Sequence, residues 1–215
     1  YVGWSRIADA KPNAGHFAIA SAERLGQVQQ VITQNVDALH QAAGSKNVID
    51  LHGRLDTVRC MKCGAPMTRV HMDELLRELN PQIEKDANHE FTPDGDAEIE
   101  AAADFKIPSC PVCAGVLKPD VVFFGEFVPM KTFSAASSLV KRADAFLIAG
   151  SSLVVNSGIR LLEQAKRQRK PIAIINRGET KGDQFASVKV NDGTSYILSE
   201  LASRFGASDL YQDID

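Results

Sequence analysis

The chain has 215 residues, of which 44% are hydrophobic and 24% are charged, and its formal net charge is −3. This length allows one large core, or one core with a small satellite module. The small net charge argues against a field that would recruit nucleic acid or an anionic membrane, and no apolar run approaches the roughly 20 residues of a membrane-spanning helix. The first residue is Tyr1 and no signal-peptide pattern follows it, so we expect a fragment rather than a processed secreted protein.

The first quarter of the chain alternates between helical and strand-like patterns. Apolar residues at helical spacing predict a helix over Ala14–Leu25, and a short helix with Asp37 as its N-cap is expected to run through Ala43. The apolar runs Val28–Thr33 and Val48–Leu51 predict buried strands on either side of that short helix.

Four cysteines follow in two C-x-x-C pairs, Cys60 with Cys63 and Cys110 with Cys113. Each pair directs two thiolates at one point, and together they complete the closed tetrahedral shell of one structural zinc ion. Two disulfides or a redox dithiol are the alternatives. The lack of a secretion signal disfavours the first, and the repetition of the motif disfavours the second. We expect the polar segment Asn88–Glu100 to loop outside the metal core.

The rest of the chain continues the alternation of strands and helices. The predicted strands are Lys118–Phe124, Ala145–Ala149, Pro171–Ile175 and Val188–Val190, and the predicted helices are Met130–Arg142, Ser157–Arg169 and Ser195–Phe205. Continuous apolar strands between helices predict an α/β fold with a Rossmann-like parallel sheet covered by helices. We therefore expect a nucleotide-binding domain at 1–56 and 117–215, with a small inserted zinc-binding module at 57–116.

Small, amide and hydroxyl side chains follow the predicted strands. In an open parallel sheet the carboxyl ends of the strands hold the ligand, and such side chains suit ribose hydroxyls and phosphates. Each loop alone is also ordinary turn chemistry, but five in one chain favour a nucleotide site. Neither G-x-G-x-x-G nor a P-loop is present, so this pattern does not name a reaction. The five loops are Gln34–Asp37, His52–Gly53, Gly150–Ser152, Asn176–Gly178 and Asn191–Gly193.

His52 is the histidine that follows a predicted strand directly and precedes a glycine. An imidazole with a pKa near neutrality is a natural general base for a sugar hydroxyl. The other four histidines, for which we expect structural or merely exposed roles, are His16, His40, His71 and His89.

Taken together, these segments resemble the sirtuin family of NAD-dependent protein-lysine deacylases. The sequence of Lys118–Glu126 most resembles the class II branch of that family, which is found in bacteria and mitochondria. The resemblance runs in the family's order from about Gly3 to Phe205. The matching motifs are Thr33–His40 (TQNVDALH), Leu51–Gly53 (LHG), the two cysteine pairs, Leu117–Glu126 (LKPDVVFFGE), Gly150–Leu153 (GSSL) and Ile175–Asn176.

The resemblance implies a role for each matching residue. His52 is implied as the catalytic base, and the four cysteines as the zinc ligands. Implied contacts to NAD come from Gln34, Asn35, Val36, Asp37, Gly150, Ser151, Ser152, Asn176, Arg177, Gly178 and Thr194. Implied contacts to the backbone around the acyl-lysine come from Val122, Phe124, Gly125 and Glu126, in a β-strand addition mode.

The implied reaction begins when the acyl-lysine oxygen attacks the anomeric carbon of NAD and nicotinamide leaves. His52 then takes a proton from the ribose diol, and the products are free lysine and O-acyl-ADP-ribose. Mono-ADP-ribosyl transfer to protein, or a silent zinc-containing peptide-binding fragment, are the alternative functions. We expect acyl-lysine proteins or peptides as partners, a monomer, and a location in the bacterial cytoplasm, or in the mitochondrial matrix of a eukaryote.

Three departures from the family's pattern bear on these expectations. The family's first strand and its glycine-rich diphosphate loop should precede Tyr1, so we expect that segment to be missing and the fragment as given to be inactive. Ala114 replaces a glycine that is common after the last cysteine. Asn156-Ser157 stands where many relatives carry a proline, which is expected to affect entry into a helix and not chemistry.

Overall fold

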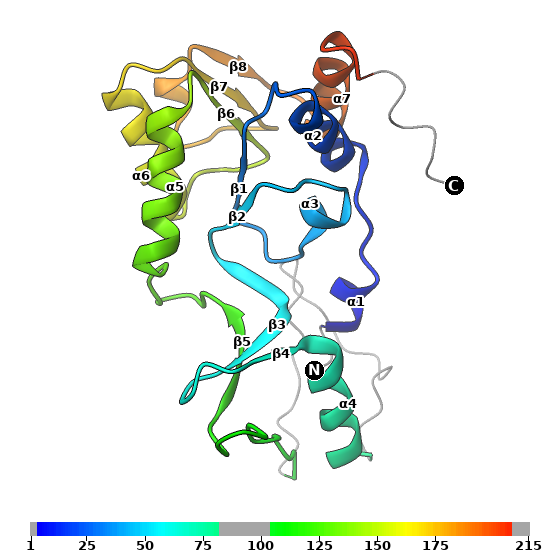
Figure 1. Cartoon of the computed structure of the whole chain (residues 1–215). Coiled ribbons are helices and arrows are strands. Elements are labelled where there is room, and N and C mark those ends of the chain that lie inside the picture. The colour runs from blue at the N-terminus through cyan, green and yellow to red at the C-terminus, as the bar shows by residue number, and fades with distance from the viewer. Residues whose placement is uncertain (1–3, 82–103, 208–215) are drawn as a thin grey trace. The chain divides into compact units, whose positions relative to one another are not determined.

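Two compact units make up the part of the chain that the computed structural model describes, residues 4–81 and 104–207 (Figure 1). The smaller unit takes the described residues of Tyr1–Ala10, Val36–Ala38 and Gly53–Val122, and the larger takes those of Lys11–Asn35, Leu39–His52 and Phe123–Asp215. The smaller unit therefore extends beyond both ends of the predicted zinc module, 57–116, and also includes two segments from earlier in the chain. The predicted loop at Asn88–Glu100 lies outside the described residues.

An antiparallel sheet forms the centre of the smaller unit. Strand β3 (Gly53–Cys60) pairs with β4 (Pro66–Thr68) on one side and with β5 (Leu117–Val121) on the other. The predicted strand Lys118–Phe124 is thus β5. It ends at Val121 and joins the antiparallel sheet because β3 is its partner. Two helices belong to this unit, α1 (Trp4–Ala8) and α4 (Arg69–Leu79).

Helix α4 closes the core of the smaller unit. Its apolar side chains Met72 and Leu76 are buried in one cluster with Val58, Cys60, Cys110 and Leu117. After the helix ends, fully buried Asn80 donates to the carbonyl of Lys106 at 2.8 Å and accepts from the Lys106 amide at 2.7 Å. The Asn80 side chain therefore links the end of α4 to the segment around Lys106, and these hydrogen bonds satisfy its own buried amide group.

The strands of the larger unit are parallel, as predicted, but they form two sheets. Strand β1 (Val31–Thr33) pairs with β2 (Val48–Asp50), and β7 (Ile172–Ile175) lies between β6 (Phe146–Ala149) and β8 (Val188–Val190). The predicted parallel arrangement of these strands is confirmed, although among the described residues β1 and β6 do not pair. The helices of this unit are α2 (Ala14–Arg24), α3 (Leu39–Ala42), α5 (Met130–Arg142), α6 (Asn156–Arg167), the 3-10 turn η1 (Asp183–Phe185) and α7 (Thr194–Arg204).

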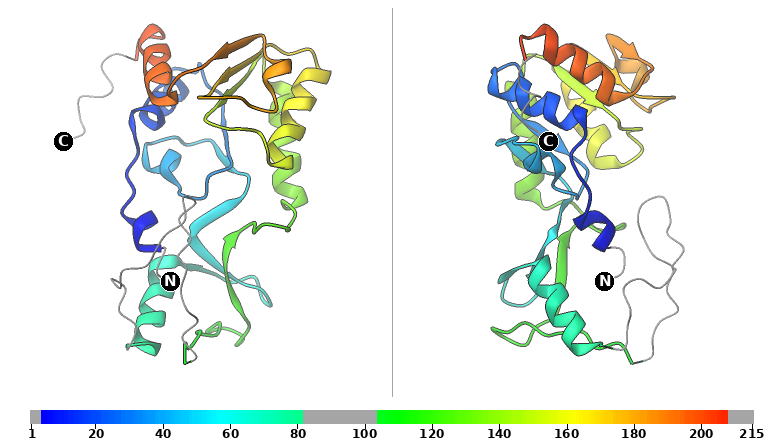
Figure 2. Two further views of the ribbon diagram at one scale, coloured as in Figure 1. Left: turned by 180° about the vertical axis from the view of Figure 1, so that it is seen from behind. Right: turned by 90° about the vertical axis from the view of Figure 1, so that its right-hand side faces the viewer.

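Side chains join the two parallel sheets where hydrogen bonds do not. Ile32 of β1 and Ile49 of β2 pack against a buried cluster that includes Ile148, Leu162 and Ile174. Helices α5 and α6 run side by side along the β6–β7–β8 sheet, while α2 and α7 pack together at its other side (Figure 2). Among the described residues, none of the helices has the length and apolar character that crossing a membrane requires.

Helix and strand boundaries follow local chemistry. Helix α2 has Asn13 as its N-cap, whose side chain accepts from the Gly15 and His16 amides, and Gly26 with a φ of 71° follows the C-cap. Helix α6 ends at Arg167, two residues before the predicted end, because Arg169 adopts a φ of 56°, which no helix tolerates.

Among the described glycines of the smaller unit, Gly53 at the start of β3 has the least room for a side chain. Its φ is +80°, and a Cβ built there would lie 2.0 Å from the Asp120 carbonyl oxygen of the paired strand. We expect Gly53→Ala to destabilise the protein by about 3 kcal/mol, because both the strand pairing and the left-handed backbone oppose a side chain. Urea unfolding measures this loss.

Gly64→Ala is the matched control. Gly64 has a φ of +74°, but nothing lies within 4 Å of the added carbon, so only the backbone strain of about 1 kcal/mol applies. Equal losses in the two variants would contradict the close approach at Asp120.

Candidate active site and zinc site

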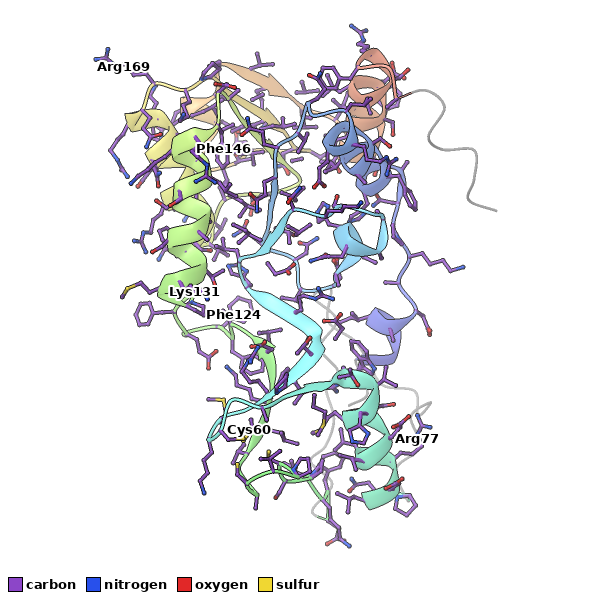
Figure 3. The ribbon with its side chains drawn as sticks, viewed as in Figure 1. Cys60, Arg77, Phe124, Lys131, Phe146 and Arg169 are labelled. Carbon is purple, nitrogen blue, oxygen red and sulfur yellow. The ribbon has the colours of Figure 1, made fainter. Side chains whose placement is uncertain are left out.

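The four cysteines of the smaller unit converge as predicted. Their sulfur atoms all lie within 4.8 Å of one another, with 3.5 Å between the Cys60 and Cys113 sulfurs and 3.8 Å between those of Cys63 and Cys110. Four sulfurs around one tetrahedral zinc, at bonds of about 2.3 Å, stand about 3.8 Å apart. The observed spacing therefore fits a zinc ion held by four thiolates. Figure 3 marks Cys60 at the end of β3.

Two turns of the same hydrogen-bond pattern present these ligands. The Cys60 amide donates to the Ala65 carbonyl at 3.0 Å and the Cys110 amide to the Gly115 carbonyl at 2.9 Å. The residue after each second cysteine is left-handed, with a φ of 74° at Gly64 and 54° at Ala114. Ala114 thus keeps the backbone shape of a glycine at a cost of about 1 kcal/mol, and the turn survives the substitution.

The chemistry of the donor set also favours a metal. Backbone N–H groups, first that of Cys63 and then that of Lys62, lower the pKa of the Cys60 thiol to about 6, whereas the neighbouring sulfurs, first that of Cys63, raise the pKa of the Cys113 thiol to about 12. A thiolate, not a thiol, is the ligand that zinc needs. Since all four positions are protein sulfurs, no position remains for water, and the site is structural rather than catalytic.

In the larger unit, His52 lies two residues after the end of β2. Its Nδ1 donates to the backbone carbonyl of Gln34 at 3.0 Å, and its Nε2 lies 2.8 Å from the hydroxyl of Ser157. Burial lowers the pKa of His52 below 6.5, although the Gln34 carbonyl opposes this. The ring is therefore oriented and neutral at physiological pH, as a general base requires.

The Gly150–Leu153 loop meets the same strand end. The Ser151 hydroxyl donates to the side-chain oxygen of Gln34 at 3.0 Å and accepts from the Leu153 amide at 3.2 Å. A Cβ on Gly150 would lie 3.4 Å from the methyl group of Thr194. Gln34, Ser151, Gly150 and Thr194, all predicted to contact NAD, are thus brought together at the carboxyl edges of both parallel sheets.

The fourth predicted loop, Asn176–Gly178, is hydrogen-bonded to the loop that follows β8. The Asn176 side chain donates to the carbonyl of Arg177, and the Gly178 amide donates to the Asn191 side chain at 2.8 Å. The Arg177 guanidinium lies 3.8 Å from the Asp192 carboxylate and is 80% exposed. The loops after β7 and β8 therefore form one hydrogen-bonded edge. This edge can offer amide groups and the exposed guanidinium of Arg177 to a ligand.

Some predicted site residues fall into different units. Asn35 is an exposed residue of the larger unit, whereas Val36 and Asp37 belong to the smaller one. The predicted substrate strand divides likewise, with Val122 in the smaller unit and Phe124, Gly125 and Glu126 in the larger.

A tight turn carries the predicted substrate residues of the larger unit. The Phe123 amide donates to the Glu126 carboxylate at 2.9 Å, and the Glu126 amide returns a bond to the Phe123 carbonyl at 2.9 Å. Gly125 has a φ of 87°, and the side chain of Phe124 at the tip is 94% exposed (Figure 3).

Two features of the site were not predicted from the sequence. Ser157, considered only for its effect on helix entry, contacts the imidazole of His52. Asn191 was noted as a strand-end residue but not as a support for Gly178. A hydroxyl at the start of a helix is usually assigned to capping, so pattern alone does not reveal the first contact.

Comparisons with known proteins agree with this geometry. The model of the Sir2 family matches residues 3–157. An NAD-dependent protein deacetylase of Xanthomonas campestris is 49% identical over 202 residues, 93% of this chain and 69% of the relative. NAD-dependent protein deacetylase 1 of Mycobacterium avium is 47% identical over 206 residues, 94% of this chain and 73% of the relative.

Solved structures give the same result. A sirtuin structure that was solved to explain the structural basis of substrate affinity is 30% identical to this chain. Its TM-score is 0.76, and the match covers 94% of this chain and 75% of that one. A Sir2 homologue in complex with NAD is 31% identical with a TM-score of 0.75, over 96% and 70%. Since the family model covers more than half of the residues and several relatives are nearly half identical, the chain belongs to the Sir2, or sirtuin, family.

Proposed function

We propose that this protein removes acyl groups from protein lysine in a reaction that consumes NAD and yields nicotinamide and O-acyl-ADP-ribose. The relatives that share nearly half of its residues are named NAD-dependent protein deacetylases, and related structures hold acetylated or propionylated peptides. The observation in this chain that carries the proposal is the oriented, neutral imidazole of His52 among the strand-end loops that suit a dinucleotide.

When bound, NAD supplies a ribose whose anomeric carbon can lose nicotinamide. His52 accepts a proton from a hydroxyl of that ribose, because burial keeps its ring neutral. The side chains of Gln34 and Ser151 are hydrogen-bonded to each other in this structure. Each can replace that hydrogen bond with one to a ribose hydroxyl and so hold the ribose. Gly150 leaves room for the ligand to approach the backbone closely.

The substrate side rests on the Phe123–Glu126 turn. Phe124, at its tip, offers an apolar surface to the hydrocarbon stem of an acylated lysine, which is neutral and cheap to bury. The backbone of Gly125 would pair with the peptide by strand addition.

The zinc ion and the cell compartment belong to the same proposal. Four thiolates gathered for zinc require a reducing compartment, which supports a location in the bacterial cytoplasm or in the mitochondrial matrix. The resemblance of Lys118–Glu126 supports placing the protein in the class II branch.

A product assay tests the proposal. We expect the full-length protein, incubated with NAD and a panel of peptides carrying acetyl, propionyl, lipoyl or dicarboxylic acyl-lysine, to form O-acyl-ADP-ribose and nicotinamide in equal amounts. Mass spectrometry detects both products. An ADP-ribosylated peptide or protein would instead indicate a transferase. Tight peptide binding without nicotinamide release, with zinc present, would indicate a silent binding module.

A further inference from the structure

Ser157 makes the second contact of the His52 ring. Its hydroxyl lies 2.8 Å from His52 Nε2, although the two residues are 105 positions apart in the sequence. Ser157 is 8% exposed and lies in the first turn of α6, and both residues belong to the larger unit. The start of α6 and the end of β2 therefore meet at the imidazole.

The partners of the ring fix the positions of its protons. The Gln34 carbonyl oxygen can only accept, so Nδ1 carries the hydrogen. In the neutral ring, Nε2 then has a lone pair and no hydrogen, and the Ser157 hydroxyl donates to it. The two contacts hold one tautomer and one ring plane, with the basic nitrogen on the side of α6.

Ser157 is the second residue of α6 and does not occupy the N-cap position of this helix. Helix α6 begins after Val155 with no side-chain hydrogen bond at the cap. The next residue, Gly158, would place a Cβ only 3.0 Å from the Gln34 side-chain nitrogen. The helix start is thus packed closely on Gln34 through a glycine, which sets the distance from Ser157 to the ring.

We propose that Ser157 is a positioning residue for His52: its hydroxyl holds the basic nitrogen in place before the ribose hydroxyl arrives. This inference rests on the proposed function, in which His52 is the base. When the ribose hydroxyl donates to Nε2, the serine hydroxyl turns away. Once Nε2 has taken the proton, its N–H can donate to the Ser157 oxygen, so the same side chain serves both charge states of the ring.

The test combines a spectroscopic and a kinetic measurement on three variants. In ligand-free protein labelled with ¹⁵N-histidine, with the His52 signals assigned from the difference spectrum of His52→Ala, we expect the Nδ1–H tautomer. Ser157→Ala should move the Nε2 resonance downfield, because a lone-pair nitrogen loses its donor. It should also lower kcat about tenfold, the size of one lost hydrogen bond, with the KM for NAD and for peptide little changed. Ser157→Thr, which keeps the hydroxyl, should restore both.

Ser137→Ala is the control for a merely structural serine. Ser137 donates to Gln164 at 2.8 Å between α5 and α6, so its loss should lower thermal stability without moving the His52 resonances or kcat. Unchanged Nε2 resonance and kcat in Ser157→Ala would overturn the proposal. A wild-type protein that forms no O-acyl-ADP-ribose, while its Nε2 resonance still depends on Ser157, would reject the function and keep the positioning contact.

Discussion

Replacing His52 with alanine in the full-length protein is expected to lower kcat for deacylation about 10³-fold, within the range that positioned general bases contribute. The reason is that the ring, held by the Gln34 carbonyl, is the neutral base placed among the strand-end loops. Zinc content should not change, because the four cysteines belong to the smaller unit and His52 to the larger. Quantifying nicotinamide and O-acyl-ADP-ribose at saturating NAD measures the effect.

His71→Ala is the matched control for removal of an imidazole. His71 lies on α4, where its side chain is 54% exposed and pairs with Glu74, so its loss should leave kcat within about twofold of wild type. Deacylation by the His52 variant at the wild-type rate would remove the base from the mechanism.

The pH dependence of the wild-type reaction follows from the same residue. Catalysis needs neutral His52, so kcat/KM falls as the pH drops through the pKa of His52 in the folded protein. Burial places that pKa below 6.5, and the acid limb of the profile should therefore lie below pH 6.5. A limb above that value would mean that the ring is more hydrated or closer to an anion than the structure has it.

The sequence predicted well those features that depend on local pattern. Helix α5 spans the predicted Met130–Arg142, where apolar residues recur at helical spacing, and β8 spans the predicted Val188–Val190, where two valines flank Lys189. The four cysteines were found for a similar reason, since ligand spacing is itself a local signal.

The features that it missed depend on partners distant in sequence. Strand β3 contains the charged residues Arg54, Asp56 and Arg59, so it lacks the apolar run that would predict a strand. One of these charges is paired across the sheet, since Arg59 lies 2.7 Å from Asp120 of β5. The contact between Ser157 and His52 spans 105 residues and has no periodicity that could reveal it. The division of the parallel strands into two sheets likewise depends on which strands lie side by side, a non-local property.

The largest effect on stability is expected from Cys60→Ser. Cys60 is 2% exposed and lies both in the core cluster of the smaller unit and in the zinc site. The substitution removes one of four ligands and leaves a buried hydroxyl among thiolates. Because metal binding is coupled to folding, we expect a loss of about 4 kcal/mol or more and a zinc content well below one per chain. Thermal unfolding and metal analysis measure the two effects.

Met61→Ser on the same turn separates the ligand from its neighbourhood. The Met61 side chain is 65% exposed and only its backbone amide is used, donating to the Val116 carbonyl at 2.9 Å, so this variant should keep its zinc and its stability. A chelator should then lower the unfolding temperature of wild type and Met61→Ser alike, and that of Cys60→Ser much less, since it has little metal left to lose. Cys60→Ser with full zinc and wild-type unfolding would show that three thiolates are enough, and that the core of the smaller unit does not depend on a closed tetrahedral site.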